Sequence, residues 1–326
     1  MKIPFITSKT VIGQTHIVKT LNAEIEAANW HIANEKPFNF RPKYLGGPAG
    51  TGKGTIVEAF FKSCFPLEQY EVFPPNGGIG DFKDLMGKIV SERDGLCSAI
   101  PATVFYDEFH EANATVGEIV KLLINKHVGT VTRTGRTYHH DQNILSHRIF
   151  FASNEVIDKA IQSRCDILET SYYSRAEIEK HIKTFLQNGI DEQALEYCVD
   201  RLKPIGRQVQ AAVEKLDQQP TNKIKLENAQ AVIRDIFGLN PGGIERKDMK
   251  ILKRLCEGAA TIDVLKWSAG DQLKKQTKER CDWLQHLAFI EPTKHQGFAL
   301  TKMGVKYYDG VITAIKEQKA KKAAKK

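Results

Sequence analysis

The sequence predicts an α/β protein with a parallel sheet domain, an all-helical unit and a C-terminal winged helix. Three observations support this fold class. Strand and helix patterns alternate up to Thr170, helical patterns alone then continue, and the last third holds three helical stretches followed by two short hydrophobic runs. We expect domains over 1–172, 173–240 and 241–310, with a basic tail over 311–326.

The first domain begins with an amphipathic helix over 14–33, because Ile17, Leu21, Ile25 and Ala28 recur at helical spacing. Five strands are expected at 43–46, 70–73, 102–106, 148–152 and 166–170. Helical patterns lie between them, around 56–61, 81–90, 116–125 and 157–163. Parallel strands joined through helices form a sheet that is covered on both faces.

The rest of the chain is mainly helical. Helices are expected at 174–187, 192–201, 206–216 and 223–237, and a linker over 240–243 separates them from helices at 245–256, 262–267 and 271–287. Hydrophobic runs at 289–290 and 298–300 flank a turn. Three helices and a small hairpin are the pattern of a winged helix.

The composition, 41% hydrophobic and 26% charged, is that of a globular protein and excludes a disordered chain. No apolar run approaches the ~18 residues of a membrane span, and the first residues lack a signal-peptide core. The six cysteines are scattered without a CxxC pair, which indicates reduced thiols in the cytoplasm. A net charge of +8 and a pI near 9.0 favour polyanionic partners, although six lysines of the tail contribute to this excess.

Residues 47–55 read GPAGTGKGT between a strand and a helix, which is the pattern of a phosphate-binding loop. Glycines let the backbone wrap around phosphates, and the lysine supplies a cation. We therefore expect binding of a nucleoside triphosphate by Gly47, Pro48, Ala49, Gly50, Thr51, Gly52, Lys53, Gly54 and Thr55.

One position departs from the usual loop. Ser or Thr normally follows the lysine directly and holds Mg²⁺, but here Gly54 follows it and Thr55 comes one place late. The loop also resembles that of adenylate kinases, which use Gly-Thr at this point. An adenylate kinase, however, leaves the later motifs unexplained.

An apolar run ends in two acids at ATVFYDEFH, residues 102–110. A buried strand delivers such acids beside the phosphates at the carboxyl edge of the sheet. We expect Asp107 to hold Mg²⁺, together with Thr55, and Glu108 to act as general base for an attacking water.

Three further polar residues fit this site. Asn154 follows the next strand and is expected to orient the water. Arg164 lies in the loop before the last strand, from which it would reach a neighbouring subunit's nucleotide, and Arg207 opens a helix of the all-helical unit, from which it would close over the phosphates.

These motifs resemble the AAA+ superfamily and, within it, the RuvB family of Holliday-junction branch-migration motors. The resemblance covers nearly the whole chain, through FITSKTVIGQ, YLGGPAGTGKGT, VFYDEFHEAN, FFASN, IGRQVQ and the stretch from GGIERKDMKILKRLCEG to FIEPTKHQGFALT. It implies an AAA+ P-loop NTPase sheet domain with an all-helical lid and a C-terminal winged helix, ATP and Mg²⁺ as cofactors, and Ile12 near the adenine. It also implies a homo-oligomeric ring or filament with a hexamer favoured, and a source in a bacterial cell or a phage-infected host.

The same resemblance places a β-hairpin at 130–143, which docks a protein partner in that family. Its Arg133 and Arg136 flank a turn and are candidates for contact with DNA or with that partner. Besides Gly54 in place of the expected Thr, two features differ from the family. The SRCD sequence around Arg164 is closer to a clamp loader, and the expected wing carries Lys294 and His295 in place of arginines.

DNA is the expected partner of the winged helix, through backbone contacts that do not depend on sequence. The candidates are Lys274, Lys275, Lys278 and Lys294. A solvated charged helix face is an equally good interpretation of this pattern. The leading function is an ATP-driven DNA motor. The alternative is an ATP-switched loader that assembles on DNA with slow hydrolysis, and a protein-remodelling ATPase would not need the basic winged helix.

Overall fold

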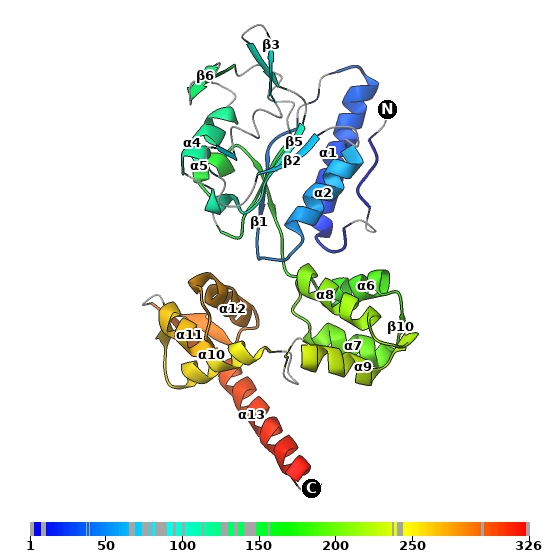
Figure 1. Cartoon of the computed structure of the whole chain (residues 1–326), viewed down its shortest axis with the longest axis vertical. Helices are drawn as coiled ribbons and strands as arrows, with labels where there is room; N and C mark the ends of the chain where they lie inside the picture. Colours follow the sequence, from blue (N-terminus) through cyan, green and yellow to red (C-terminus); the bar gives the residue numbers. More distant parts are fainter. Residues whose placement is uncertain are drawn as a thin grey trace. The chain divides into compact units, whose positions relative to one another are not determined.

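The computed structural model describes residues 3–7, 11–36, 38, 40–64, 69–73, 78, 80–81, 90–93, 96–99, 102–112, 114–124, 130–133, 136–139, 148–155, 157–236, 238–239, 244–294 and 297–323. The chain forms two compact units (Figure 1). Unit 1 holds residues 1–184 and 204–207, and unit 2 holds 185–203 and 208–326. The domain boundaries expected from the sequence stay predictions.

Unit 1 is built on a five-stranded sheet in the order β2-β5-β8-β1-β9. Its strands are β1 (Lys43–Gly46), β2 (Gln69–Phe73), β5 (Ala102–Tyr106), β8 (Arg148–Ala152) and β9 (Asp166–Glu169). All four pairings between neighbours are parallel, as the sequence predicts.

Side chains alternate between the two faces of this sheet because successive residues of a strand point in opposite directions. Phe105 and Phe150 pack with α1 (Thr15–Ala33) and α2 (Lys53–Cys64). Tyr106 and Phe151 pack on the other face with α4 (Ala114–Leu123) and α5 (Lys159–Gln162). Figure 1 shows these helix pairs on opposite sides of the sheet. The near-continuous hydrophobic strands, such as RIFFA in β8, follow from this burial on both faces.

One lysine lies in this core. Lys43 of β1 is 2% exposed, and its Nζ lies 2.6 Å from Glu24 of α1 and 3.2 Å from Asp166 of β9. A buried ammonium is tolerated when acids pair with it. Lys43 therefore has a structural role, linking the first helix to the sheet.

Two antiparallel hairpins also belong to unit 1. The pairing of β6 (Thr130–Arg133) with β7 (Arg136–His139) confirms a hairpin within the expected span 130–143, of which 134–135 and 140–143 lie outside the described residues. The other hairpin pairs β3 (Val90–Arg93) with β4 (Leu96–Ala99). The helix expected over 81–90 is wrong at its end, because Val90 begins β3 and 82–89 lie outside the described residues.

The helical part of the chain contains α6 (Arg175–Phe185), α7 (Glu192–Arg201), α8 (Gly206–Asp217), α9 (Leu226–Ala231) and a π-helical turn, η3 (Val232–Ile236). The short strands β10 (Gly189–Ile190) and β11 (Lys223–Ile224) pair in parallel. The helix expected over 223–237 is therefore wrong at its start, since its first two residues belong to β11.

The last third of the chain has the three helices and the hairpin that the sequence predicts. Its elements are α10 (Arg246–Cys256), β12 (Ala260–Thr261), α11 (Ile262–Ala269), α12 (Lys274–His286), β13 (Ile290–Pro292) and β14 (Gly297–Leu300). The strands pair antiparallel in the order β12-β14-β13. Leu252, Leu265, Cys281 and Leu284 bring the three helices into one hydrophobic core.

The expected basic tail is not a plain extension beyond the hairpin. A single helix, α13 (Lys302–Ala323), runs through most of 311–326, and Tyr307 near its start stacks on Phe289 with ring centroids 4.3 Å apart. Among the described helices, none is both long and apolar enough to cross a membrane.

Candidate nucleotide site

Four strands of the sheet end beside one another at the same edge. The phosphate loop follows β1, Asp107 follows β5, Asn154 follows β8 after one residue, and Thr170 follows β9. Parallel strands bring their carboxyl ends together, and this edge is where ligands bind in open α/β sheets. The topology thus gathers motifs that lie far apart in the sequence.

Glycines shape the phosphate loop. Gly47, Gly50 and Gly52 have φ angles of +123°, +77° and +92°, which side chains rarely allow. A Cβ on Gly47 would lie 2.3 Å from the carbonyl oxygen of Thr170, so only glycine fits there. The hydroxyls of Thr51 and Thr170 lie 2.6 Å apart, and this hydrogen bond ties the loop to the end of β9.

A chain of hydrogen bonds connects three of the predicted site residues. The Lys53 Nζ donates to the carbonyl oxygens of Gly47 and Pro48 at 2.9 Å and to the Asn154 Oδ1 at 2.7 Å. The Asn154 Nδ2 donates to both carboxylate oxygens of Glu108, at 2.6 and 2.9 Å. Asn154 therefore bridges the cation of the loop and the acid that the sequence predicts as a general base.

Lys53 is only 8% exposed, and this burial lowers its pKa to about 8. The carboxylates of Glu108 and Asp107 act in the opposite direction and favour the charged form, while Arg207 lowers the pKa further. An ammonium held by neutral carbonyls in a buried position is stabilised by an incoming polyanion. The loop is thus electrostatically suited to phosphates.

The donor set beside Lys53 suits a hard cation such as Mg²⁺, since the Asp107 and Glu108 carboxylates and the Thr55 hydroxyl all offer oxygen. The Asp107 Oδ1 accepts from the backbone N–H of Glu108 at 3.0 Å, and Glu108 itself is in the left-handed region with φ 45°. Gly54 is the second residue of α2 and is not crowded, because a Cβ there would meet no atom closer than the Phe105 Cε1 at 3.9 Å.

The N-terminal segment packs against the same edge. Ile12 is 5% exposed, and Gln14 joins the segment to the end of the sheet. The Gln14 Nε2 donates to the Ser171 carbonyl at 2.6 Å, and the Ser171 N–H donates to the Gln14 Oε1 at 3.0 Å. The position of Ile12 close to a bound nucleotide stays a prediction.

The two predicted arginines differ in surroundings. Arg207 is exposed at the start of α8, and its backbone N–H donates to the Gly50 carbonyl at 3.3 Å, which brings it next to the phosphate loop. Arg164 follows α5, and its guanidinium donates back to the carbonyl of Ala160. Within a single chain, Arg164 is therefore folded onto its own helix.

Tyr173 is a site residue that sequence analysis missed. Tyr173 is 8% exposed, and its side chain lies against three glycines. A Cβ added to Gly13, Gly52 or Gly206 would lie 2.9, 3.6 or 2.7 Å from the nearest atom of the Tyr173 side chain. Burial raises the pKa of its hydroxyl. The only signal in the sequence was the set of glycines that leave room for the ring.

Four of the six residues predicted to contact DNA belong to unit 2, and the other two, Arg133 and Arg136, belong to unit 1. Lys274 forms an ion pair with Asp263 at 2.7 Å, and Lys294 is exposed at the turn between β13 and β14. Lys275 and Lys278 lie with Lys274 on α12. The backbones of Arg133 and Arg136 face each other across the β6–β7 pair, while their side chains are outside the described part of the chain.

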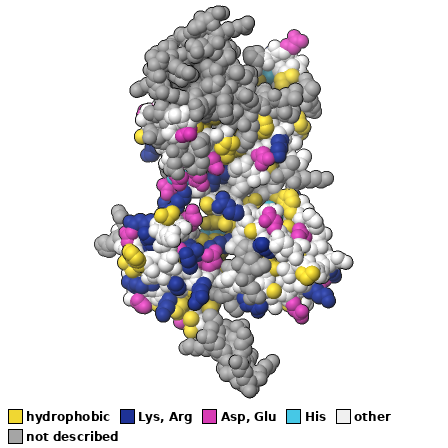
Figure 2. Space-filling view, in the orientation of Figure 1, with side chains coloured by type: hydrophobic (Ala, Val, Ile, Leu, Met, Phe, Trp, Pro, Cys, Tyr) yellow, Lys and Arg dark blue, Asp and Glu magenta, His cyan; other side chains and the backbone are white. Residues whose placement is uncertain are grey.

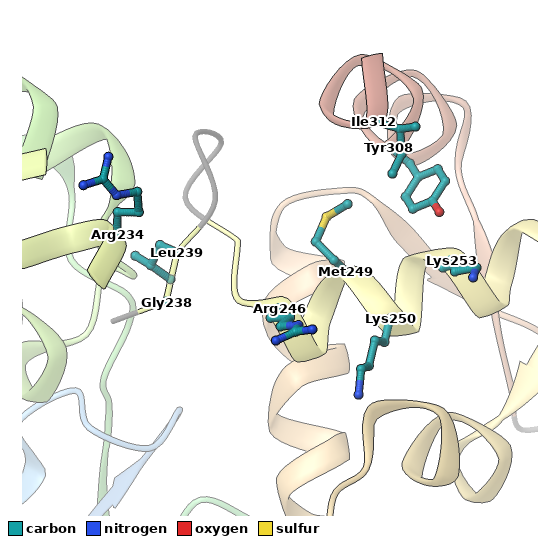
Figure 3. Close-up of a pocket in the computed structure, with 9 residues that line it drawn as sticks. All are labelled: Arg234, Gly238, Leu239, Arg246, Met249, Lys250, Lys253, Tyr308 and Ile312. Carbon is teal, nitrogen blue, oxygen red and sulfur yellow. The ribbon is translucent and has the colours of Figure 1, made fainter. Parts of the chain in front are cut away.

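A basic surface on α10 was not foreseen. Arg246, Lys250 and Lys253 are exposed at helical spacing, and no described acid forms an ion pair with any of them. They line a hollow of about 420 Å³ together with Arg234, Gly238, Leu239, Met249, Tyr308 and Ile312. Figure 3 shows Met249 pointing from α10 toward Tyr308 and Ile312, with Lys250 pointing away from them. We call Arg246, Lys250 and Lys253 the α10 cation row.

The fold resembles solved structures of one motor protein. The Thermotoga maritima RuvB Holliday junction branch migration motor aligns over 91% of this chain and 95% of its own, with a TM-score of 0.72 and 20% identity. A point mutant of the same Thermotoga maritima protein aligns over 93% of this chain and 98% of its own, with a TM-score of 0.74 and 19% identity.

In sequence, the chain is 25% identical over 269 residues to the chromosomal replication initiator protein DnaA of Methylacidiphilum infernorum. The match covers 72% of this chain and spans about half, 53%, of that relative. No protein-family model matches the chain. Together with the sheet order and the phosphate-loop geometry, the structural likeness shows that this chain has the same fold as the Thermotoga maritima RuvB motor.

Proposed function

We propose that this chain is an AAA+ ATPase that acts on DNA as an oligomeric motor of the branch-migration type. The observation that carries the ATPase assignment is the hydrogen-bonded chain from Lys53 through Asn154 to Glu108 at the carboxyl edge of the sheet. The likeness to RuvB, solved as a Holliday junction branch migration motor, supports the DNA role.

In this mechanism the phosphate loop and Lys53 bind the triphosphate, and Arg207 closes over it from the start of α8. Asp107 and Thr55 would hold Mg²⁺, which supplies charge neutralisation on the phosphates when bound. Glu108 takes the proton from the attacking water. Asn154 holds the carboxylate of Glu108 by two hydrogen bonds before nucleotide binds, so movement of this amide toward the nucleotide frees the base.

The test of the ATPase assignment is Glu108→Gln, which keeps the side chain's shape and removes the base. We expect ATP affinity within about twofold of wild type and turnover reduced by about 10²- to 10⁴-fold. Glu58→Gln is a matched control, because it makes the same change at an exposed glutamate of α2 that pairs with Lys62. Wild-type turnover in Glu108→Gln would refute the assignment.

DNA would lie on unit 2 through phosphate contacts. The candidates for these contacts are Lys274, Lys275, Lys278 and Lys294. The α10 cation row adds three positive charges, none of which forms an ion pair with a described acid. Arg133 and Arg136 on the β6–β7 hairpin are the candidates for a protein partner or for further DNA contact. Such contacts steer and position the duplex without selecting a sequence.

The motor assignment is tested on a synthetic four-way junction with homologous arms. A motor resolves the junction into two duplexes with ATP and not with a non-hydrolysable analogue. Glu108→Gln should bind the junction and leave it intact. ATP-dependent assembly on DNA without any strand exchange would instead favour the second candidate.

That second candidate is an ATP-switched loader with slow hydrolysis. It is favoured by Gly54 in place of the usual metal-binding hydroxyl and by the sequence relative that is a chromosomal replication initiator protein. For a loader, sedimentation should detect oligomers on DNA with the non-hydrolysable analogue, while the four-way junction stays unresolved with ATP.

A further inference from the structure

Trp267 lies on the protein surface with 82% of its area exposed. Tryptophan usually buries most of its ring, and leaving the ring in water costs free energy. Trp283, on the next helix, is 8% exposed. The exposure of Trp267 therefore points to a ligand that covers the ring.

Trp267 belongs to a small apolar patch. Val264 precedes it by three residues on the same face of α11 and is 38% exposed, while Leu265 and Ala269 of the opposite face are buried in the core. Leu273, 60% exposed, is the N-cap residue of α12. The ion pair between Asp263 and Lys274 holds the start of α12 against α11. We call Val264, Trp267 and Leu273 the tryptophan patch.

Positive charge adjoins this patch. The Lys266 Nζ lies 5.9 Å from the centroid of the Trp267 ring, which is within reach of a cation–π contact. Lys274 follows Leu273 directly. Figure 2 shows hydrophobic side chains at the surface among Lys and Arg over the region of α11 and α12. An apolar ring beside cations complements a ligand that carries both a flat face and negative charge.

We propose that the tryptophan patch binds an unpaired nucleobase of a DNA strand, with Trp267 stacking on the base and Lys266 and Lys274 beside the adjoining phosphates. Every nucleobase offers a π-face, so stacking on an aromatic side chain tolerates any sequence. In an intact duplex both faces of a base are already stacked, and the patch gains nothing. This inference rests on the proposed DNA role and adds a preference for DNA with unpaired bases.

The first test compares DNA affinities of Trp267→Ala for single-stranded oligothymidine and for a blunt duplex of equal length. Loss of one stacked base weakens single-strand binding by about 5- to 150-fold, and duplex binding should change by less than about twofold. Trp267→Phe keeps a stacking face and should recover most of the affinity. Because Trp267 is exposed, the unfolding temperature should stay at the wild-type value.

Trp30 provides a matched control. It is 53% exposed on α1, and the Lys36 Nζ lies 4.8 Å from its ring centroid, so it repeats the combination of exposed ring and lysine outside the patch. Trp30→Ala should bind both DNAs as wild type does. Stacking also quenches tryptophan fluorescence, and oligothymidine should quench wild type and Trp30→Phe but not Trp267→Phe.

The outcomes separate this inference from the proposed function. Wild type that binds neither DNA would refute the DNA role itself. If wild type and Trp267→Ala bind DNA with equal affinities, base stacking by Trp267 is refuted and the DNA role is not. The same holds if Trp267→Ala weakens binding to single strand and to duplex equally. A Trp267→Ala variant that loses self-association while its DNA affinity is unchanged would likewise overturn base stacking in favour of a protein contact.

Discussion

The buried lysine of the phosphate loop predicts a specific pH dependence of ATP binding. Burial lowers the pKa of Lys53 to about 8 in the free protein. Phosphates stabilise the ammonium, so only the protonated form binds well, and binding above pH 8 takes up a proton. Since about one in ten side chains is protonated one pH unit above the pKa, ATP affinity should fall about tenfold from about pH 7 to about pH 9.

The measurement is calorimetric titration with a non-hydrolysable ATP analogue at about pH 7, 8 and 9, in two buffers with different ionisation enthalpies. The buffer dependence reports the proton uptake directly. Lys53→Arg is the control, because a guanidinium stays charged throughout and should give a flat profile even if its affinity is lower. A wild-type profile as flat as that of Lys53→Arg, without proton uptake, would show that Lys53 stays protonated over the whole range and would refute the electrostatic argument.

Three further predictions concern metal binding, assembly and DNA. Gly54→Thr should lower the Mg²⁺ concentration for half-maximal ATP turnover, because it adds a hydroxyl next to Lys53. Gly54→Ala also adds a Cβ in ordinary contact with Phe105, and up to about 1 kcal/mol of helix stability, but should not change this concentration; identical metal dependence in both variants would contradict the prediction. Mixtures of Glu108→Gln and Arg164→Ala should hydrolyse ATP faster than either variant alone, because in the proposed oligomer some sites regain both groups. Co-assembly of the two variants with no gain in rate would rule out action of Arg164 in trans. Replacing the α10 cation row by Ala should make the plot of log K for DNA binding against log salt less steep, by about 0.9 for each phosphate that is no longer neutralised. Replacing Lys274, Lys278 and Lys294 of α12 and the wing by Ala should have the same effect. A set whose replacement leaves the slope unchanged does not bind the DNA backbone.

The three central strands of the sheet in unit 1, β1, β5 and β8, are predictable from sequence because they are buried on both faces. Runs such as ATVFY and RIFFA lack the regular alternation of polar and apolar residues that marks a surface strand. Turn-forming or charged residues lie at the ends of these runs. The hairpin of β3 and β4 escaped prediction for the opposite reason. Its sequence, VSER and LCSA, has neither a hydrophobic run nor an alternating pattern that distinguishes it from a loop.

Within the candidate site, the motifs identified the residues but not their partners. Lys53, Glu108 and Asn154 each stood out by spacing, yet their connection through two hydrogen-bonded steps depends on the order of the strands. Tyr173 carries no motif at all. Its contribution depends on space left by Gly13 and Gly206, which lie far from it in sequence, so only the packed structure brings it to notice.

Net charge was the least reliable guide to the proposed DNA surface, because the sequence does not distinguish a cation that is paired with an acid from one that is not. Arg280 sits on the basic helix α12, but its guanidinium lies 2.6 Å from Glu245 and 2.7 Å from Asp248, whose side chain is fully buried. Burial raises the pKa of Asp248, and Lys203 and Arg280 act against this by favouring its charged form. Arg280 therefore balances acids inside unit 2, where it links α12 to the start of α10. The α10 cation row has no such described partner, so it can exchange counterions for phosphates without first breaking an ion pair.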